Sequence, residues 1–114
     1  MPRSDRRENF RIVYPHHVCP AFVWRGETAR VIDCSEHGFR VEIQCYSDVP
    51  ARDARVHGRI VFLDGTAVEV FGVVRHVRGR VVGVNFEAPG VPWRVLLREQ
   101  VCLRTGGPEW AASA

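Results

Sequence analysis

Two short segments of the chain carry side chains of the kind that bind phosphate and guanine. The first reads Arg6-Arg7-Glu8-Asn9-Phe10-Arg11, in which Arg7 and Arg11 stand four residues apart. A guanidinium can donate two parallel hydrogen bonds to a phosphodiester or to the O6 and N7 acceptors of guanine, and it can stack on a base. Two such groups on one extended segment could hold a planar anion from one side. A solvated basic tail is the alternative interpretation of this segment taken alone.

The second segment reads Asp33-Cys34-Ser35-Glu36-His37-Gly38 and lies between two predicted strands. Asp33 offers acceptors for the N–H donors of a guanine edge, and Ser35 offers a hydroxyl to a phosphate oxygen. Gly38 permits a positive φ or a close approach of another backbone. The alternative interpretation is an ordinary turn, in which the Asp and Ser side chains bond to their own backbone.

The sequence favours neither an enzyme nor a metal site. Asp33, Ser35 and His37 have the residue types of a catalytic triad, but they share one turn, whereas a triad holds its histidine between the other two groups. His16 and His17 are adjacent and would point to opposite faces of an extended segment. Four cysteines, none of them in a C-x-x-C pair, are predicted to be reduced: Cys19, Cys34, Cys45 and Cys102.

Length and composition predict one globular domain. The chain has 114 residues, of which 46% are hydrophobic and 25% charged. No apolar run approaches the roughly 18 residues that a membrane helix needs, and the start lacks the apolar stretch of a signal peptide. We therefore expect a cytoplasmic protein without membrane insertion, and a monomer. All sixteen Lys and Arg positions are arginine, which either genome composition or a need for phosphate recognition would explain. The net charge of +3 is modest for binding a nucleic acid polymer.

Hydrophobic alternation predicts a mainly β fold. Six stretches have the sequence pattern of strands joined by short turns, with hairpin signals at Asp64-Gly65 and Arg78-Gly79. The stretches are 18–24, 28–33, 39–44, 55–63, 66–77 and 81–86. They predict an antiparallel β-barrel or sandwich. Phe39, Phe62, Phe71 and Phe86 fall in apolar strand patterns, so we expect them mainly in the core, which disfavours a nucleic-acid-binding barrel that would expose its aromatic residues.

A C-terminal helix is predicted after Pro92. An apolar stripe would cap the barrel or bind a partner, with charged residues such as Glu99 on the opposite side. The stripe consists of Trp93, Leu96, Leu97 and Val101, and the other charged residues are Arg94 and Arg98. The chain thus divides into a flexible arginine-rich arm (1–16), a barrel with a C-terminal helix (17–104) and a frayed tail (105–114).

In combination, the R-x-x-x-R arm and the D-x-S-x-x-G turn resemble the signature of the PilZ domain family. The segments 72–77 and 82–86 are similar to the closing strands of that family, and the resemblance extends over residues 5–104. It implies a six-stranded antiparallel barrel with a terminal helix, which receives the second messenger cyclic di-GMP and catalyses nothing.

The resemblance also implies roles for individual residues. Arg7 and Arg11 would bind guanine and phosphate, while Asp33, Ser35 and Gly38 would shape the opposing wall. In the family, an arginine just before the first motif arginine tends to accompany a stacked pair of ligands. Arg6 therefore suggests two nucleotides for each chain, and a titration that saturates at one would contradict this hypothesis.

A mechanism follows as a hypothesis. Residues 3–14 would be mobile without ligand, and cyclic di-GMP would pull them onto the barrel beside Asp33 and Ser35, gaining charge-assisted hydrogen bonds. The new surface would act on a separate, unidentified protein partner. The main alternative is a PilZ-like adaptor that binds proteins without any nucleotide.

Overall fold

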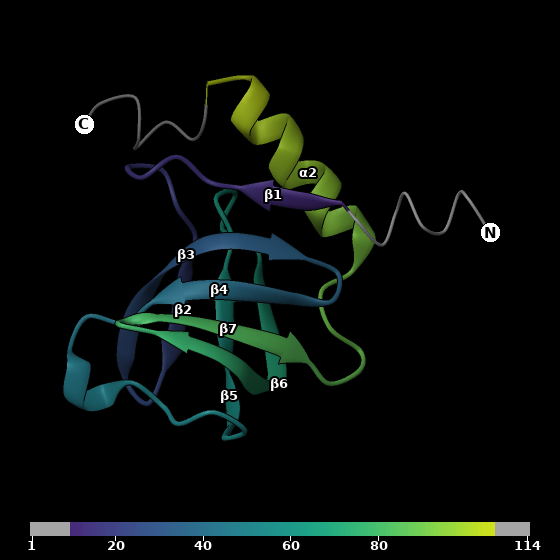
Figure 1. The fold of residues 1–114 in the computed structure, drawn as a ribbon. Helices are drawn as coiled ribbons and strands as arrows, with labels where there is room; N and C mark the ends of the chain where they lie inside the picture. Colours follow the sequence, from purple (N-terminus) through teal and green to yellow (C-terminus); the bar gives the residue numbers. More distant parts are fainter. Residues whose placement is uncertain (1–9, 107–114) are drawn as a thin grey trace.

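A computed structural model of the chain describes residues 10–106. The described chain folds into β-strands, one short 3₁₀ helix and one α-helix (Figure 1). The strands are β1 Arg11–Val13, β2 Ala21–Trp24, β3 Glu27–Ser35, β4 Gly38–Glu42, β5 Arg55–Val61, β6 Ala67–Arg78 and β7 Val81–Phe86. The helices are η1 Tyr46–Asp48 and α2 Trp93–Arg104.

Strands β2 to β7 form the closed antiparallel barrel that the sequence predicts. Their order is β3-β2-β5-β6-β7-β4, and a further pairing of β3 with β4 closes the ring (Figure 1). Closure leaves no long unpaired edge between these strands. The sandwich alternative is therefore wrong, and all six predicted stretches are strands, the last with the predicted ends and the other five with at least one end shifted.

Strand β1 was not expected, because residues 11–13 fall inside the range assigned to the arm. It pairs antiparallel with the last residues of β3, on the edge that β2 occupies further along. Directly after it, the backbone N–H of Tyr14 donates to the carbonyl of Ile32 over 3.0 Å, and Tyr14 is 5% exposed. In this structure the chain is thus already part of the folded domain from Arg11, four residues before Pro15, inside the range assigned to the arm.

The core is built from alternate side chains of the strands, which point into the barrel. The Phe39 ring packs against Phe22 and Phe86, with centroids 4.9 Å and 5.3 Å away. Phe62 is also buried, but the expectation for Phe71 is wrong. Val70, Gly72 and Val74 take the inward positions of β6, so Phe71 points outward, where it is 41% exposed and stacks on His57.

Helix α2 lies across one end of the barrel beside β1, as Figure 1 shows at the top of the molecule. Its buried face consists of Val95, Leu96 and Glu99. Two members of the predicted stripe, Leu97 and Val101, are 41% and 55% exposed instead. The helix is therefore a cap, as predicted, but its packed face is rotated and includes a carboxylate that was placed on the solvent side.

Glu99 is buried because two donors meet its carboxylate. The Tyr14 hydroxyl donates to Oε1 over 2.7 Å, and the backbone N–H of Leu63 donates to Oε2 over 3.0 Å. Burial nevertheless raises the pKa of Glu99 above its ordinary value. A single side chain thus joins α2 both to the segment that follows β1 and to the β5–β6 turn.

Candidate ligand-binding site

A β-bulge places the aspartate of the second motif on the outer face of the barrel. Pairing between β3 and β4 passes from Val31 opposite Val41 to Asp33 opposite Arg40, so Ile32 has no partner of its own. Without this extra residue, Ile32 would stand opposite Arg40 and Asp33 would fall into the inward alternation. The bulge therefore brings a carboxylate and a guanidinium side by side.

Two arginines hold the Asp33 carboxylate. Arg11 Nη1 lies 2.5 Å from Oδ1, while Nε and Nη2 of Arg40 each lie 2.6 Å from Oδ2. The Asp33 side chain is 0% exposed, whereas those of Arg11 and Arg40 are 44% and 53% exposed. A guanidinium has five N–H donors, so each arginine keeps donors that can face a ligand. The buried anion thus orients two exposed cations.

Ser35 shapes the turn between β3 and β4. It is 2% exposed, its hydroxyl donates to the carbonyl of Gly38 over 3.4 Å, and its oxygen accepts from the backbone N–H of His37 over 3.1 Å. The alternative interpretation of an ordinary turn therefore holds for Ser35, whose hydroxyl bonds to the backbone. It does not hold for Asp33, whose carboxylate bonds to side chains.

Gly38 is required by a close approach of β7. A Cβ atom at this position would lie 2.2 Å from the carbonyl oxygen of Val84. The φ of Gly38 lies outside the left-handed region, so only the second of the two reasons anticipated for a glycine holds. The absence of a side chain lets the start of β4 lie tightly against β7.

The outer face carries a row of cross-strand neighbours beside these residues. Asp33 pairs with Arg40, Arg40 with Gly83, and Gly83 with His76. Because Gly83 has no side chain, the row dips between Arg40 and His76. A hollow of about 320 Å³, here called the Asp33 hollow, lies at this end of the strands. Its lining includes Arg11, Asp33, Gly38, Arg40, His76 and Asn85.

The sequence model of the PilZ domain matches residues 5–101 of the chain. The chain belongs to the PilZ domain family. PilZ is a family of cyclic di-GMP-binding domains, which are receptors and generally not enzymes. The match includes both motifs and every strand of the barrel.

A solved structure supports the fold assignment. The crystal structure of the Legionella uncharacterized protein Lpg0364 aligns over 84% of this chain and 92% of its own, with a TM-score of 0.52 and 14% identity. At this identity the likeness concerns the fold alone. No match was found among the curated proteins.

The site of this PilZ domain contains residues that the sequence analysis did not select. Arg40, His76, Gly83 and Asn85 line the Asp33 hollow. The alternation of β4 indicated that Arg40 points outward, but only the strand register shows that Asp33 is its neighbour. Of the residues that were selected, Arg11, Asp33 and Gly38 line the hollow, and Ser35 holds its turn. Arg6 and Arg7 lie outside the described residues.

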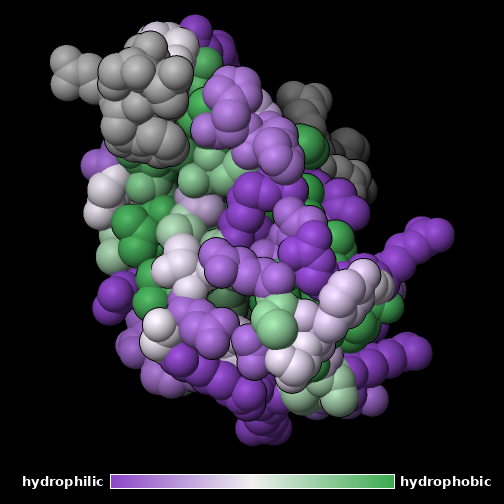
Figure 2. All heavy atoms as spheres, turned by 90° about the vertical axis from the view of Figure 1, so that its left-hand side faces the viewer, coloured by the Kyte–Doolittle hydropathy of each residue, from purple (hydrophilic) through white to green (hydrophobic). Residues whose placement is uncertain are grey.

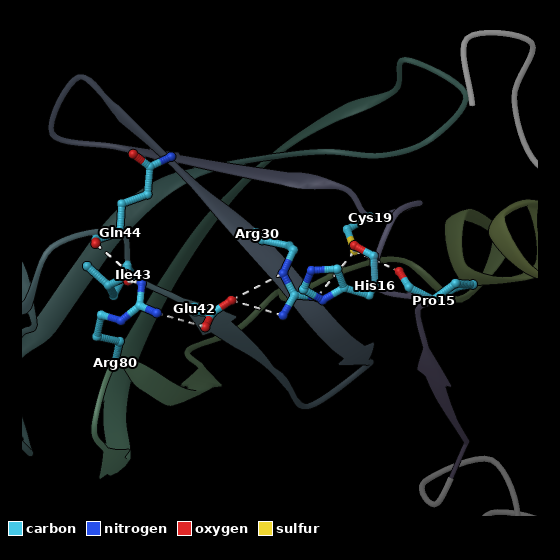
Figure 3. A network of polar contacts seen from close by, with 8 residues as sticks. All are labelled: Pro15, His16, Cys19, Arg30, Glu42, Ile43, Gln44 and Arg80. Carbon is cyan, nitrogen blue, oxygen red and sulfur yellow. Dashed lines mark hydrogen bonds and ion pairs between the residues drawn. The ribbon is translucent and has the colours of Figure 1, made fainter. Parts of the chain in front are cut away.

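Two other arginines of the PilZ domain serve its structure. Glu42 accepts hydrogen bonds from Arg30, with its Oε1 3.0 Å from Nη2, and its Oε2 lies 3.4 Å from Arg80 Nη2 (Figure 3). The hydrogen bond from Arg30 holds the pKa of Glu42 below its ordinary value. Arg80 also donates to the carbonyls of Ile43 and Gln44. These contacts fasten the end of β4 to β3 and to the β6–β7 turn.

Neither a membrane helix nor a metal cluster is found within residues 10–106. No helix there is long and apolar enough to cross a membrane. The same residues contain no group of three or more His, Cys, Asp and Glu side chains that could hold a metal ion. Each described cysteine has a free thiol.

Proposed function

We propose that this PilZ domain binds cyclic di-GMP at the Asp33 hollow, through Arg7 and Arg11 of the first motif and the turn of the second. One observation carries the proposal: a fully buried carboxylate orients two half-exposed guanidiniums at the rim of a hollow. A cluster with two cations for one anion attracts an anionic ligand. Arg40 joins the binding residues in this proposal.

The ligand and the hollow have complementary chemistry. Cyclic di-GMP has two phosphodiesters and two guanines, and the outward donors of Arg11 and Arg40 can bond bidentately to either group. Both Asp33 oxygens are engaged by arginines and the side chain is fully buried, so Asp33 would act by orienting the two guanidiniums toward the ligand. Gly83 provides a floor without a side chain, on which a planar base can lie between Arg40 and His76.

The first motif supplies a second side to the site. Arg11 is held by β1, and Arg6 and Arg7 precede it by a few residues, so the segment before β1 can close over a nucleotide in the hollow. This closure involves fewer residues than the mechanism expected from the sequence, since β1 and Tyr14 already pack on the barrel. The closed segment and the nucleotide would form the surface that a separate protein partner recognises.

Calorimetric titration tests the proposal. Cyclic di-GMP is titrated into the wild type, Arg7→Ala and Arg40→Ala, with GTP as the control ligand and Arg94→Ala as the control variant, because Arg94 is an exposed arginine on α2. We expect selective binding that each site variant weakens at least about tenfold, since a charge-assisted bidentate contact is lost, while Arg94→Ala binds normally. The measured ratio of nucleotide to chain decides whether Arg6 accompanies two ligands.

The contrary result is equally clear. If the folded wild type gives neither heat nor thermal stabilisation with excess cyclic di-GMP, the proposal is wrong. The function would then be that of a nucleotide-independent adaptor.

A further inference from the structure

A second and larger groove adjoins the Asp33 hollow. It has a volume of about 860 Å³, and its lining includes Arg40, Arg52, Arg75, His76, Arg78 and Gly83. Three of these residues, Arg40, His76 and Gly83, line the hollow as well. The hollow and this groove, here called the basic groove, therefore continue one another along the outer face of β4, β7 and β6.

A second β-bulge exposes the end of β6 toward this groove. Pairing passes from Val74 opposite Val84 to His76 opposite Gly83, which leaves Arg75 without a partner residue. From Arg75 to Arg78, four successive residues are exposed, although a regular strand would turn every second one inward. The bulge thus displays charged and apolar side chains together.

The charges of the basic groove are poorly neutralised. Arg75 Nη1 lies 3.4 Å from Asp53 Oδ1 in an exposed pair, which adds little stability. Within the described chain, neither Arg52 nor Arg78 has an ion-pair partner. The face that holds η1 and the β6–β7 turn is mostly hydrophilic in its lower part (Figure 2). Such a concentration of unpaired cations on a modestly charged chain indicates an anionic occupant.

The remaining lining favours a peptide over a nucleic acid. Single-stranded nucleic acids bind where several bases stack on aromatic side chains, and the residues that line the groove include His76 but no Phe, Tyr or Trp. The lining instead contains Val77, which is 41% exposed, and Val81, which is partly exposed. Arginines around small apolar side chains suit a segment in which Asp or Glu alternates with aliphatic residues.

We propose that the basic groove docks an acidic, aliphatic segment of a second protein, distinct from the partner of the nucleotide-bound surface, and that cyclic di-GMP weakens this docking. The second part rests on the proposed nucleotide site. Arg40 and His76 line both cavities, so a nucleotide in the hollow takes up donors that the acidic segment would use. It also brings two negative charges to within a Debye length of the groove, where they repel the segment. The nucleotide-free domain therefore holds this segment in the basic groove, and the messenger releases it, whereas the nucleotide-bound surface is recognised by a different partner.

The experiment uses the full chain and a fluorescein-labelled peptide in which Glu and Asp alternate with Leu. Fluorescence anisotropy compares this peptide with a version carrying Lys in place of each acid, and with labelled oligothymidylate. The test variant is Arg52→Glu/Arg78→Glu. Its control is Arg94→Glu/Arg104→Glu, which makes the same change of net charge at two exposed arginines of α2. Each titration is repeated with saturating cyclic di-GMP.

We expect the acidic peptide alone to bind the wild type, and the groove variant to bind it at least about tenfold more weakly than the α2 control. Cyclic di-GMP should reduce the affinity of the wild type for the peptide. Equal weakening in both variants would show attraction by net charge only and would overturn the docking site, as would preferential binding of the oligonucleotide. Tighter or unchanged peptide binding with the nucleotide present would overturn the antagonism.

Calorimetry of the groove variant with cyclic di-GMP separates this proposal from the proposed function. Normal nucleotide binding by Arg52→Glu/Arg78→Glu supports two distinct sites. A lower nucleotide-to-chain ratio would assign the groove to the nucleotide itself and overturn the docking site. Absence of nucleotide binding by the wild type refutes the nucleotide site, whereas the peptide titrations without nucleotide still decide the docking site.

Discussion

At the scale of single residues, the site depends on two glycines with different reasons to be glycine. A Cβ on Gly38 would lie 2.2 Å from the carbonyl oxygen of Val84, which belongs to the backbone of β7. A Cβ on Gly83 would lie 3.4 Å from Cβ of His76, which is ordinary contact, and its φ is not in the left-handed region. Gly38 is thus needed for folding, while Gly83 is buried in the lining of the Asp33 hollow, beside His76 and Arg40, where a Cβ would meet only ordinary contacts.

We therefore predict that alanine at Gly38 mainly lowers stability, whereas alanine at Gly83 mainly weakens nucleotide binding. Gly38→Ala should lower the free energy of unfolding by about 1–3 kcal/mol or more, because two backbones must separate. Gly83→Ala should change it by less than about 0.5 kcal/mol but weaken cyclic di-GMP binding about tenfold, since the methyl group occupies the floor of the hollow. Urea unfolding and calorimetry measure the two quantities. A stable Gly83→Ala protein with unaltered nucleotide affinity would exclude Gly83 as the floor of the site.

At the scale of elements, Glu99 is the contact that fixes α2 against the rest of the domain. Its carboxylate accepts from the Tyr14 hydroxyl, just after β1, and from the Leu63 backbone, just after β5. At the start of α2, the Trp93 ring meets Phe10 edge to face, with centroids 4.9 Å apart. Helix α2 therefore positions the strand that carries Arg11, although none of its residues lines the Asp33 hollow.

The raised pKa of Glu99 predicts a pH dependence of stability. Between the ordinary carboxyl pKa of 4.5 and the raised value, the unfolded chain releases this proton first. The contribution of Glu99 is therefore complete below the ordinary value and is lost as pH rises through the raised one. The lowered pKa values of Glu42 and Asp64 act in the opposite direction, with stability lost as pH falls.

The variant Glu99→Gln isolates this effect. Its amide oxygen can accept from the Leu63 N–H while its N–H₂ donates to the Tyr14 oxygen, so the packing is kept. We expect the unfolding free energy of the wild type to fall relative to that of Glu99→Gln as pH rises from about 4 to about 8, measured by urea unfolding. A constant difference between the two proteins over this range would contradict the prediction.

At the scale of the whole molecule, the barrel presents its site where three segments meet. The start of β1, the β3–β4 turn and the outer face of β7 border the Asp33 hollow, while α2 covers a separate end of the barrel (Figure 1). A ligand in the hollow can therefore contact the motif arginines without displacing the core. This arrangement suits a receptor whose response is closure of its N-terminal segment.

Limited proteolysis tests that closure. Trypsin cleaves after arginine, and Arg3, Arg6 and Arg7 all precede β1. We expect saturating cyclic di-GMP to slow cleavage at these positions, because a segment closed over the nucleotide is less accessible, whereas GTP should not. Cleavage after Arg104, at the end of α2, provides a control within the same chain. Equal rates at the N-terminal positions with and without cyclic di-GMP would rule out closure of the segment.

The sequence by itself determined the six barrel strands, the turns between them and the terminal helix. Hydrophobic alternation and turn residues are local signals, so they can be recognised in the sequence alone. The two motifs were equally visible, because Asp33, Ser35 and Gly38 are near neighbours in the chain. Strand β1 was not visible, since three residues contain too little alternation to be distinguished from an arm.

Only the tertiary structure decided how these parts form a site. The bulge at Ile32 turns Asp33 outward to Arg40, and this register depends on β4 and β7 as much as on β3. Glu99 is buried because donors from Tyr14 and Leu63 compensate its desolvation, and both lie far from it in sequence. Local patterns specify which elements form, whereas long-range pairing and polar compensation decide which side chains meet.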